Sequence, residues 1–319
     1  HVKRVLFVVK RLDSGGIENY LLRFIKHARH DIEPYVLCNG GVAGVLDEEY
    51  KDNGASIIYL KMSYLPILSW FNLVRLIRLH KIDSIVSFTG DFAAFEMMVG
   101  WFCALPKIIC FYRSAGFAFK RTKMRNLYIW ICNKLVSFFS TKILSNSVSA
   151  LDCFHPNWEK ESGRYQVIYN GVPSGPYLTD TNCSYVRDRY QIPSEAFVIG
   201  HVGRFDVAKN HELIVNVAID LCQKYDDIYF LLCGKGVQEG VAHKLQKFDL
   251  DHRIIMPGLV DDVPSVLQEI DLFFFPSIRE GQPNALIEAM LCNLPFIATD
   301  IAPIKACIPF NLQESLISL

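Results

Sequence analysis

Residues 272–291 read LFFFPSIREGQPNALIEAML, a very apolar run followed by a polar loop and a helical pattern. A run that is apolar throughout suits a strand covered on both faces, because each face packs against helices. Pro283 suits the first turn of a helix, so the sequence predicts a strand over 271–276 and a helix over 284–291. Strand, loop and helix in this order form the repeating unit of a parallel α/β sheet.

The same alternation extends over most of the chain. It pauses between Asn170 and Ala196, where glycine, proline and small polar residues cluster as turn formers. Since 319 residues are about twice the roughly 150 of one domain, we expect two Rossmann-like domains facing each other across a cleft, residues 1–172 and 173–319. The second domain is expected to be incomplete at its C-terminal end. The predicted strands are 5–9, 35–38, 56–60, 84–88, 107–111, 197–202, 228–233, 271–276 and 295–298, and the predicted helices are 17–28, 68–79, 124–139, 210–224, 237–248 and 284–291.

Composition narrows the class of protein. Lysine plus arginine and aspartate plus glutamate number 33 each, so no net positive field disposes the chain to bind nucleic acid. The ten cysteines are scattered without a CxxC pair, which is typical neither of a zinc site nor of a disulfide framework. Buried free thiols fit a reducing compartment, and neither a run of about 18 apolar residues nor a signal peptide is recognisable, so we expect a cytoplasmic location.

Two glycine-containing turns follow predicted strands, one in each half of the chain. Gly15 and Gly16 open the first predicted helix, whose N-terminus can hold a phosphate or carboxylate; an ordinary turn is the alternative. Gly203, Arg204 and Lys209 follow the first strand of the second domain, where α/β sheets bind ligands. Such paired cations can clamp a diphosphate, and two solvated loop cations are the alternative.

Acidic side chains flank the loop quoted above. Glu280 lies on that loop and Glu288 on the second turn of the helix, so both carboxylates are expected at one ligand site, with solvated carboxylates as the alternative. Gly281 allows close backbone approach, and the helix N-terminus can bind sugar hydroxyls or phosphate oxygens. Asp262 is expected to cap a helix rather than to bind a metal, and the isolated histidines are expected to be structural or exposed.

Two positively charged amphipathic segments lie in the first half of the chain. Residues 119–139 begin with basic side chains and continue with Trp130 and Phe138 among apolar residues. Residues 64–81 carry Arg75 and Arg78 at helical spacing. Such helices can lie on an anionic membrane surface, and a core-facing helix with a charged entry is the alternative.

Taken in chain order, these motifs resemble the retaining, GT-B fold glycosyltransferases of family 4, also called glycosyl transferases group 1. The segment from Glu280 to Glu288 matches the family's Glu-x7-Glu pattern, and residues 167–172, VIYNGV, resemble the stretch that leaves its N-terminal domain. The other matching motifs are Gly15-Gly16, Gly203-Arg204 with Lys209, and Gly234-Lys235-Gly236. The resemblance implies an α/β fold of the GT-B type.

The resemblance also implies roles for the matching residues. Arg204 and Lys209 would hold the diphosphate of a nucleotide-sugar donor, a UDP-sugar being favoured, and Glu288 would bond its ribose. Glu280 would contact the transferred sugar. No metal or other cofactor is expected, since cations and a helix N-terminus can stabilise the departing diphosphate. The remaining expected donor-binding residues are Gly15, Gly16, Gly203, Gly234, Gly281, Pro283, Asn284, Ala285 and Leu286.

The sequence departs from the family pattern after the strand 108–112. Many relatives carry a histidine there, whereas this chain has Arg113, which we expect to contact a phosphate or an anionic acceptor. The expected function is retaining transfer of a hexosyl or N-acetylhexosaminyl group to a glycan acceptor, lipid-linked, in cell-surface polysaccharide assembly. The protein is expected in the cytoplasm, at the inner face of the cell membrane. A nucleotide-sugar epimerase on the same scaffold is the alternative, and a two-domain binding protein is a third interpretation.

Overall fold

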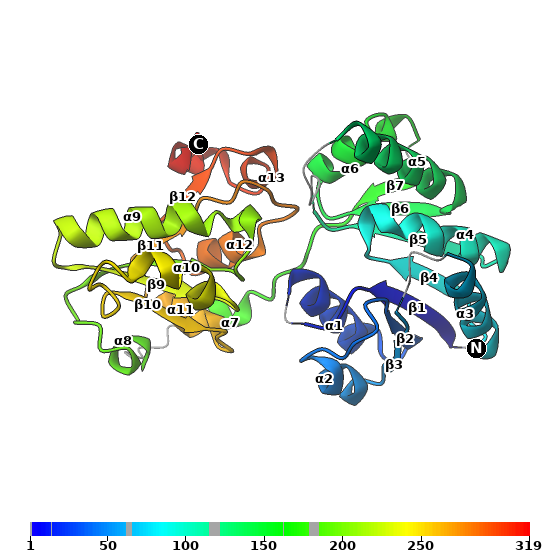
Figure 1. Cartoon of the computed structure of the whole chain (residues 1–319), viewed down its shortest axis with the longest axis horizontal. Helices are drawn as coiled ribbons and strands as arrows, with labels where there is room; N and C mark the ends of the chain where they lie inside the picture. Colours follow the sequence, from blue (N-terminus) through cyan, green and yellow to red (C-terminus); the bar gives the residue numbers. More distant parts are fainter. Residues whose placement is uncertain (1, 14, 62–65, 115–121, 162, 179–184) are drawn as a thin grey trace. The chain divides into compact units, whose positions relative to one another are not determined.

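The computed structural model describes the chain except for residues 1, 14, 62–65, 115–121, 162 and 179–184 (Figure 1). The chain divides into two compact units, His1–Asn170 and Gly171–Leu319. The sequence analysis placed this boundary two residues later, between residues 172 and 173. Each unit holds a parallel sheet with helices packed on both faces. The predicted class, two Rossmann-like α/β domains, is therefore confirmed.

The sheet of the N-terminal unit has the order β3-β2-β1-β4-β5-β6-β7, with every neighbouring pair parallel. The first strand lies in the middle of this sheet. Strands β2 and β3 are added on one side of β1 and the strands from β4 onward on the other side, so the helices divide between the two faces. The strands are β1 (Lys3–Val9), β2 (Ile32–Cys38), β3 (Ser56–Tyr59), β4 (Ser84–Ser87), β5 (Lys107–Tyr112), β6 (Lys142–Ser145) and β7 (Tyr165–Val167).

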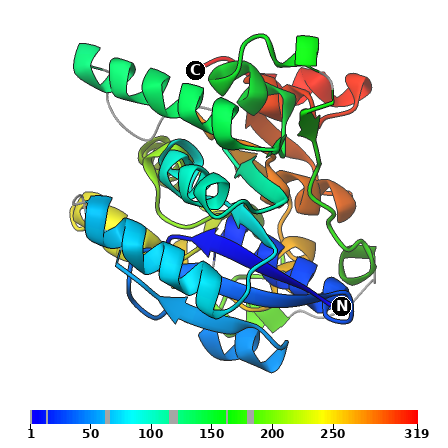
Figure 2. The same cartoon turned by 90° about the vertical axis from the view of Figure 1, so that its right-hand side faces the viewer.

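Two separate cores hold the helices of this unit against the sheet. One core receives Leu21 and Ile25 of α1 together with Tyr50 of α2, and the other receives Leu73 of α3 and Val136 of α5. Figure 2 shows α3, α4 and α5 as a row of helices on one face of the sheet. The helices are α1 (Gly16–Ala28), α2 (Asp47–Asp52), α3 (Pro66–Leu79), α4 (Ala94–Phe102), α5 (Lys123–Phe139) and α6 (Val148–Phe154), with short 3-10 turns η1 (Gly90–Ala93) and η2 (Trp158–Glu161).

The sheet of the C-terminal unit has the order β10-β9-β8-β11-β12-β13, again parallel throughout. Its first strand, β8, therefore lies in the middle of the sheet, and the carboxyl ends of β8, β9 and β11 share one edge. The strands are β8 (Phe197–Val202), β9 (Ile228–Cys233), β10 (Ile254–Gly258), β11 (Leu272–Phe275), β12 (Phe296–Thr299) and β13 (Leu316–Ile317). The helices are α7 (Gly175–Leu178), α8 (Tyr185–Arg189), η3 (Val207–Lys209), α9 (His211–Lys224), α10 (Val237–Leu245), α11 (Val263–Gln268), α12 (Asn284–Leu291), α13 (Ala302–Lys305) and η4 (Phe310–Ser315).

Every strand and helix predicted from the sequence is present, with boundaries within three residues of those predicted. The sequence analysis gave no prediction for β6, β7, β10, β13 or the short helices, since elements of a few residues carry no periodic pattern. It also gave no prediction for residues 94–102, which form the helix α4. Within the described part of the chain, no helix combines the length and apolar character needed to cross a membrane.

Candidate active site

Two glycine turns pack backbone against backbone at the carboxyl ends of β8 and β9. The Gly203 N–H donates to the Cys233 carbonyl over 2.8 Å. A Cβ on Gly234, which has φ +154°, would lie 2.0 Å from the Gly203 carbonyl oxygen. Only glycine fits at residue 234, because both the backbone angle and the neighbouring carbonyl exclude a side chain. The two glycines predicted to bind the donor thus also fix how the two loops lie together.

Lys209 and Glu280 meet at this same edge, although 71 residues separate them in sequence. The Lys209 Nζ lies 2.6 Å from the Glu280 Oε1, and the two side chains are 21% and 10% exposed. The Lys209 Nζ also lies 4.9 Å from the centre of the Phe275 ring. The Ile278 N–H donates to the Ala208 carbonyl over 2.8 Å, which ties the two loops together by backbone as well as by charge. Two residues chosen from distant motifs therefore form one charged site.

Local backbone geometry explains the conformation of the loop that carries Lys209. The Asp206 carboxylate accepts a hydrogen bond from the Ala208 N–H over 2.8 Å and so begins the short turn η3, which ends at Lys209. Asn210 follows in the left-handed conformation with φ 58°, which reverses the chain into α9. Asn is among the few residues that tolerate this region well. The loop conformation is therefore set by its own residues.

Two histidines adjoin this loop, and the sequence analysis missed their contact. The rings of His201 and His211 are 5.1 Å apart between centroids, and both side chains are buried. The His201 Nδ1 lies 2.9 Å from the Phe274 carbonyl, so Nδ1 carries the proton and Nε2 is left as an acceptor. Burial lowers the pKa of His201 to about 3, and it also lowers the pKa of His211. The site therefore contains a pair of neutral imidazoles, which spacing along the chain does not reveal.

The other predicted site residues of this unit differ in how exposed they are, and most of them lie on α12 or on the loop before it. Arg204 is exposed, and Glu288 is half-buried on the second turn of α12. Among the described residues, no side chain makes a capping hydrogen bond at the start of α12, whose N-cap is Pro283. Gly281 and Pro283 are buried, Asn284 and Ala285 are half-buried, and Leu286 is fully buried in the core. Glu280 lies on the loop that leads to Pro283, and Leu286 holds the helix to the sheet.

In the N-terminal unit, Arg113 follows the carboxyl end of β5 and packs its guanidinium on aromatic rings. Its Cζ lies 3.8 Å from the centre of the Tyr20 ring and 4.9 Å from that of Phe111. Its Nε and Nη1 are buried and make no hydrogen bond to any described residue. Burial lowers the pKa of Arg113 to about 10, so the group stays cationic at neutral pH. A buried cation with unused donors is suited to an anionic ligand.

Gly15 and Gly16 begin α1, the helix that carries Tyr20. Gly15 is the N-cap with an extended backbone, φ −151°, and the Asn19 N–H donates to its carbonyl over 2.9 Å. A Cβ on Gly16 would meet nothing within 4 Å. Backbone strain thus does not require glycine at residue 15, and packing within the described chain does not require it at residue 16.

Possible metal ligands do not gather in the part of the chain that the structure describes. No group of three or more His, Cys, Asp or Glu side chains there could hold a metal ion. Asp262 caps α11, with its Oδ1 accepting from the Ser265 N–H over 3.2 Å, as the sequence analysis predicted.

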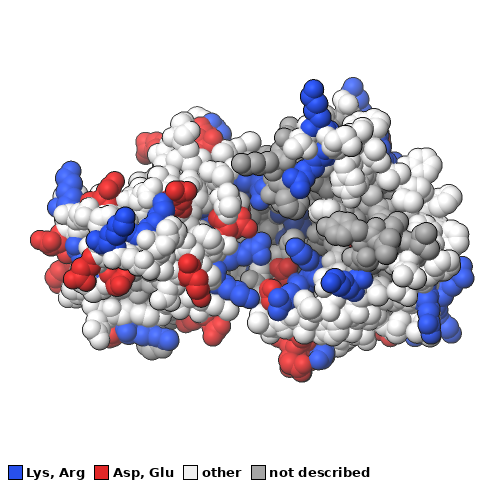
Figure 3. Space-filling model, viewed as in Figure 1, with Lys and Arg blue, Asp and Glu red and all other residues white. Residues whose placement is uncertain are grey.

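The row α3–α5 exposes many large apolar side chains, which we call the α3–α5 face. In α5, only Cys132 and Val136 are buried. On the side of the molecule seen in Figure 3, acidic side chains are frequent over the C-terminal unit, whereas the N-terminal unit shows broad stretches without charge. The predicted basic residues 120 and 121, and residues 64 and 65, lie outside the described chain. The α3–α5 face comprises Leu68, Phe71, Leu79, Trp101, Phe102, Met124, Leu127, Tyr128, Trp130, Ile131 and Phe138.

Comparison with known proteins gives a consistent family. Residues 196–312 match the family model described as glycosyl transferases group 1. The capsular polysaccharide biosynthesis glycosyltransferase CapH of Staphylococcus aureus is 23% identical over 93% of this chain and 81% of its own length. The Escherichia coli enzyme named UDP-Gal:alpha-D-GlcNAc-diphosphoundecaprenol alpha-1,3-galactosyltransferase is 24% identical over 73% of this chain and 62% of its own.

Solved structures agree on the fold. The crystal structure of Anabaena HepE in complex with UDP-glucose superposes with a TM-score of 0.79 at 19% identity, covering 99% of this chain and 85% of HepE. WaaG, a glycosyltransferase involved in lipopolysaccharide biosynthesis, superposes with a TM-score of 0.71 at 16% identity, covering 97% of this chain and 84% of WaaG. The family match over residues 196–312, the glycosyltransferase relatives and the GT-B fold together support a group 1 glycosyltransferase of the family 4 type.

Proposed function

We propose that the protein transfers a sugar from a UDP-sugar to a lipid-linked glycan, with retention of anomeric configuration, during assembly of a cell-surface polysaccharide. The observation that carries the proposal is the Lys209–Glu280 pair, whose carboxylate belongs to the loop that leads into α12. A cation and a carboxylate at one sheet edge are suited to a donor that has both a diphosphate and a sugar. The relatives named above act in polysaccharide and lipid-linked glycan synthesis, and HepE binds UDP-glucose.

The donor would be held by groups of the C-terminal unit. Lys209 would bind one phosphate, and the exposed Arg204 of the same loop would bind another. Glu280 would accept hydrogen bonds from sugar hydroxyls, and Glu288 would accept them from the ribose. The backbone around Gly281 and the start of α12 offers N–H groups to the sugar and phosphates. No divalent metal is needed in this arrangement, since the cations face the charge that develops on the leaving group.

The reaction is a substitution at the anomeric carbon of the donor sugar. The bond between that carbon and the diphosphate oxygen breaks, and its electron pair leaves with UDP. The acceptor hydroxyl oxygen forms the new bond on the same face, and its proton passes to a phosphate oxygen of the departing UDP. Lys209 and Arg204 stabilise the charge on that diphosphate, while Glu280 orients the sugar and offsets positive charge on its ring.

In the N-terminal unit, the buried guanidinium of Arg113 would bind a phosphate or an anionic acceptor. Its Nε and Nη1 donors are unused by the described residues, so a ligand oxygen would satisfy them at no cost to existing contacts. Gly16 leaves space at the start of α1 for a ligand to approach. A diphosphate on the acceptor lipid has the required charge.

The α3–α5 face would rest on an anionic membrane. Its exposed Trp101 suits the interface between headgroups and acyl chains, and the exposed Arg75 and Arg78 suit anionic lipids. A protein positioned in this way would meet a lipid-linked acceptor at the membrane surface. Co-sedimentation with anionic vesicles tests this part, and equal transfer to soluble sugars without vesicle binding would contradict it.

The transfer itself is tested by supplying a panel of UDP-sugars together with membrane lipid extracts that contain undecaprenyl-linked glycans. We expect sugar incorporation into the lipid fraction that is lost in Glu280→Ala, and an α-linked product from an α-linked donor by NMR. Wild-type transfer by Glu280→Ala would contradict the site. Conversion of the UDP-sugar without any acceptor would instead indicate the epimerase.

A further inference from the structure

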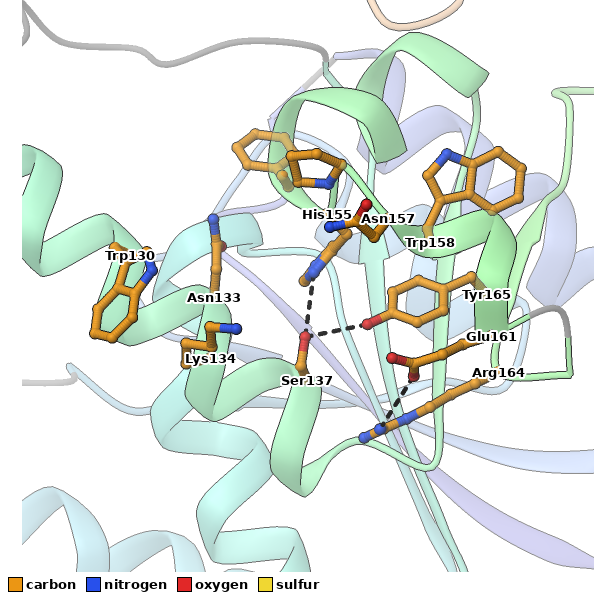
Figure 4. A pocket seen from close by; sticks show the side chains of 12 residues that line it. Trp130, Asn133, Lys134, Ser137, His155, Asn157, Trp158, Glu161, Arg164 and Tyr165 are labelled. Atoms are coloured by element: carbon orange, nitrogen blue, oxygen red, sulfur yellow. Dashed lines mark hydrogen bonds and ion pairs between the residues drawn. The ribbon is translucent and has the colours of Figure 1, made fainter.

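A pocket of about 430 Å³ lies in the N-terminal unit between α5, the end of α6 and the start of β7 (Figure 4). Tyr165 is the first residue of β7, so the pocket extends toward the amino ends of the strands. Gly15 and Arg113, which are assigned to substrates, follow the carboxyl ends of β1 and β5 and do not line the pocket. Its lining residues include Asn133, Lys134, Ser137, His155, Asn157 and Trp158.

The floor of the pocket is a chain of neutral hydrogen-bonding groups. The His155 Nδ1 lies 3.2 Å from the Ser137 hydroxyl, which in turn lies 3.1 Å from the Tyr165 hydroxyl. The His155 Nε2 lies 3.2 Å from the Tyr112 hydroxyl. Burial lowers the pKa of His155 to about 4, so the imidazole is neutral at pH 7. A floor of hydroxyls and a neutral imidazole suits alcohol groups better than an ion.

Indole rings flank this polar floor. Trp158 donates its indole N–H to the Asp152 carboxylate over 2.9 Å, which fixes the orientation of the ring. In Figure 4, Trp130 lies on the opposite side from Trp158. An aromatic wall beside several hydrogen-bonding groups is the combination that a pyranose ring uses, since the ring has both C–H faces and hydroxyls.

The charged side chains of the lining are mostly engaged with protein groups. Arg164 donates to the Ser140 carbonyl over 2.7 Å and lies 3.8 Å from the Glu161 carboxylate. Lys134 and the exposed amide of Asn157 make no hydrogen bond to any described residue, so they can serve a ligand. One available ammonium is a weak site for a phosphate, for which paired cations or a guanidinium fork are typical.

We propose that this pocket binds a neutral sugar ring and is a secondary glycan subsite of the enzyme. The inference rests on the proposed function only in naming the source of that sugar, a residue of the polysaccharide under assembly. The subsite would hold the glycan on the N-terminal unit while its reactive end is elsewhere, which raises the effective concentration of the acceptor.

The test is ligand-detected NMR on the full chain with UDP in excess, so that the donor site is occupied. The probes are glucose, galactose, N-acetylglucosamine, N-acetylgalactosamine and inorganic phosphate. We expect at least one sugar to bind, with affinity reduced about tenfold in Trp158→Ala and measurably in Asn157→Ala. Phe310→Ala, which removes an aromatic side chain that is 89% exposed in the C-terminal unit, is the matched control and should bind as wild type. Trp158→Phe supplies a folded variant if Trp158→Ala does not fold.

Three results would overturn the inference. The first is that none of the sugars binds. The second is that the Trp158 and Asn157 variants bind the sugars as well as the wild type does. The third is that phosphate binds instead of the sugars and that this phosphate binding is lost in Lys134→Ala. Failure of the proposed function gives a different result, because UDP would then no longer raise the melting temperature of any variant. If both proposals hold, Trp158→Ala keeps the UDP response of the wild type and loses only sugar binding.

Discussion

Replacing Lys209 by methionine separates the structural role of the Lys209–Glu280 pair from its role in donor binding. In this variant the Glu280 carboxylate, 10% exposed, loses the cation 2.6 Å away. Stranding a fully buried charge costs about 3–5 kcal/mol, and because this pair is partly exposed we expect a loss of about 2 kcal/mol in the free energy of unfolding. Glu280→Gln added to Lys209→Met removes the stranded charge, so the double variant should recover about 1 kcal/mol.

The same substitution removes one charge-assisted contact to the donor. Such a contact contributes about 1.5–3 kcal/mol, so we expect the Kd for UDP to rise about tenfold to a hundredfold. Urea unfolding followed by circular dichroism measures the first effect, and titration calorimetry with UDP measures the second. Lys244→Met is the matched control, because its partner Glu212 is 78% exposed and such surface pairs contribute only about 0–1 kcal/mol.

The reasoning is refuted if Lys209→Met is as stable as the wild type and binds UDP equally well. It is also refuted if the losses in stability of the two single variants simply add in the double variant, since two groups in contact should show coupling.

Three further predictions concern other parts of the fold. Gly234→Ala places a Cβ 2.0 Å from the Gly203 carbonyl and should cost about 3 kcal/mol or more in thermal melts, whereas Gly171→Ala, with nothing within 4 Å, should cost less than about 1 kcal/mol. Burial raises the pKa of Glu96 to about 7, so the folded state binds this proton more tightly than the unfolded chain does. The stability of the wild type relative to Glu96→Gln should therefore fall by about 3 kcal/mol as the pH rises from about 5 to above 7. A difference in urea midpoints that does not change with pH would refute this. Arg113→Ala should cost no more than about 1 kcal/mol of stability while lowering turnover about tenfold, and near-normal turnover would refute the role given to its guanidinium.

Local sequence patterns were sufficient to predict the main strands and helices and the fold class. The apolar run 272–275 and Pro283 mark a buried strand and a helix start, and the structure places β11 and α12 there. The repetition of such strand–helix units predicts a parallel sheet. In a parallel sheet the loops after β8 and β11 lie at the same edge. The sequence analysis assigned Lys209 and Glu280 to one nucleotide-sugar donor only through the family resemblance, and the ion pair shows that the two side chains meet.

Contacts between distant segments could not be predicted in this way. His201 ends up beside His211 because β8 and the start of α9 pack around one loop, and nothing in their spacing signals it. Burial of Arg113 depends on Tyr20 of α1, which lies 93 residues earlier and joins it only in the folded sheet. Glu96 reads as a charge on an apolar helix, yet Ser87 and Thr89 donate hydrogen bonds to it inside the unit. Each of these groups depends on tertiary packing that a periodic pattern does not encode.

Thermal stabilisation by nucleotides tests the central claim most directly. UDP, GDP, ADP, CMP and NAD are each added in large excess to the purified chain, because a ligand that binds only the folded state raises its melting temperature. A clear rise with UDP and none with NAD is the result that a nucleotide-sugar transferase predicts, and the rise should shrink in Lys209→Met. A rise with NAD, or no rise with any of the nucleoside diphosphates, would contradict the assignment of Arg204, Lys209 and Glu288 to a donor site.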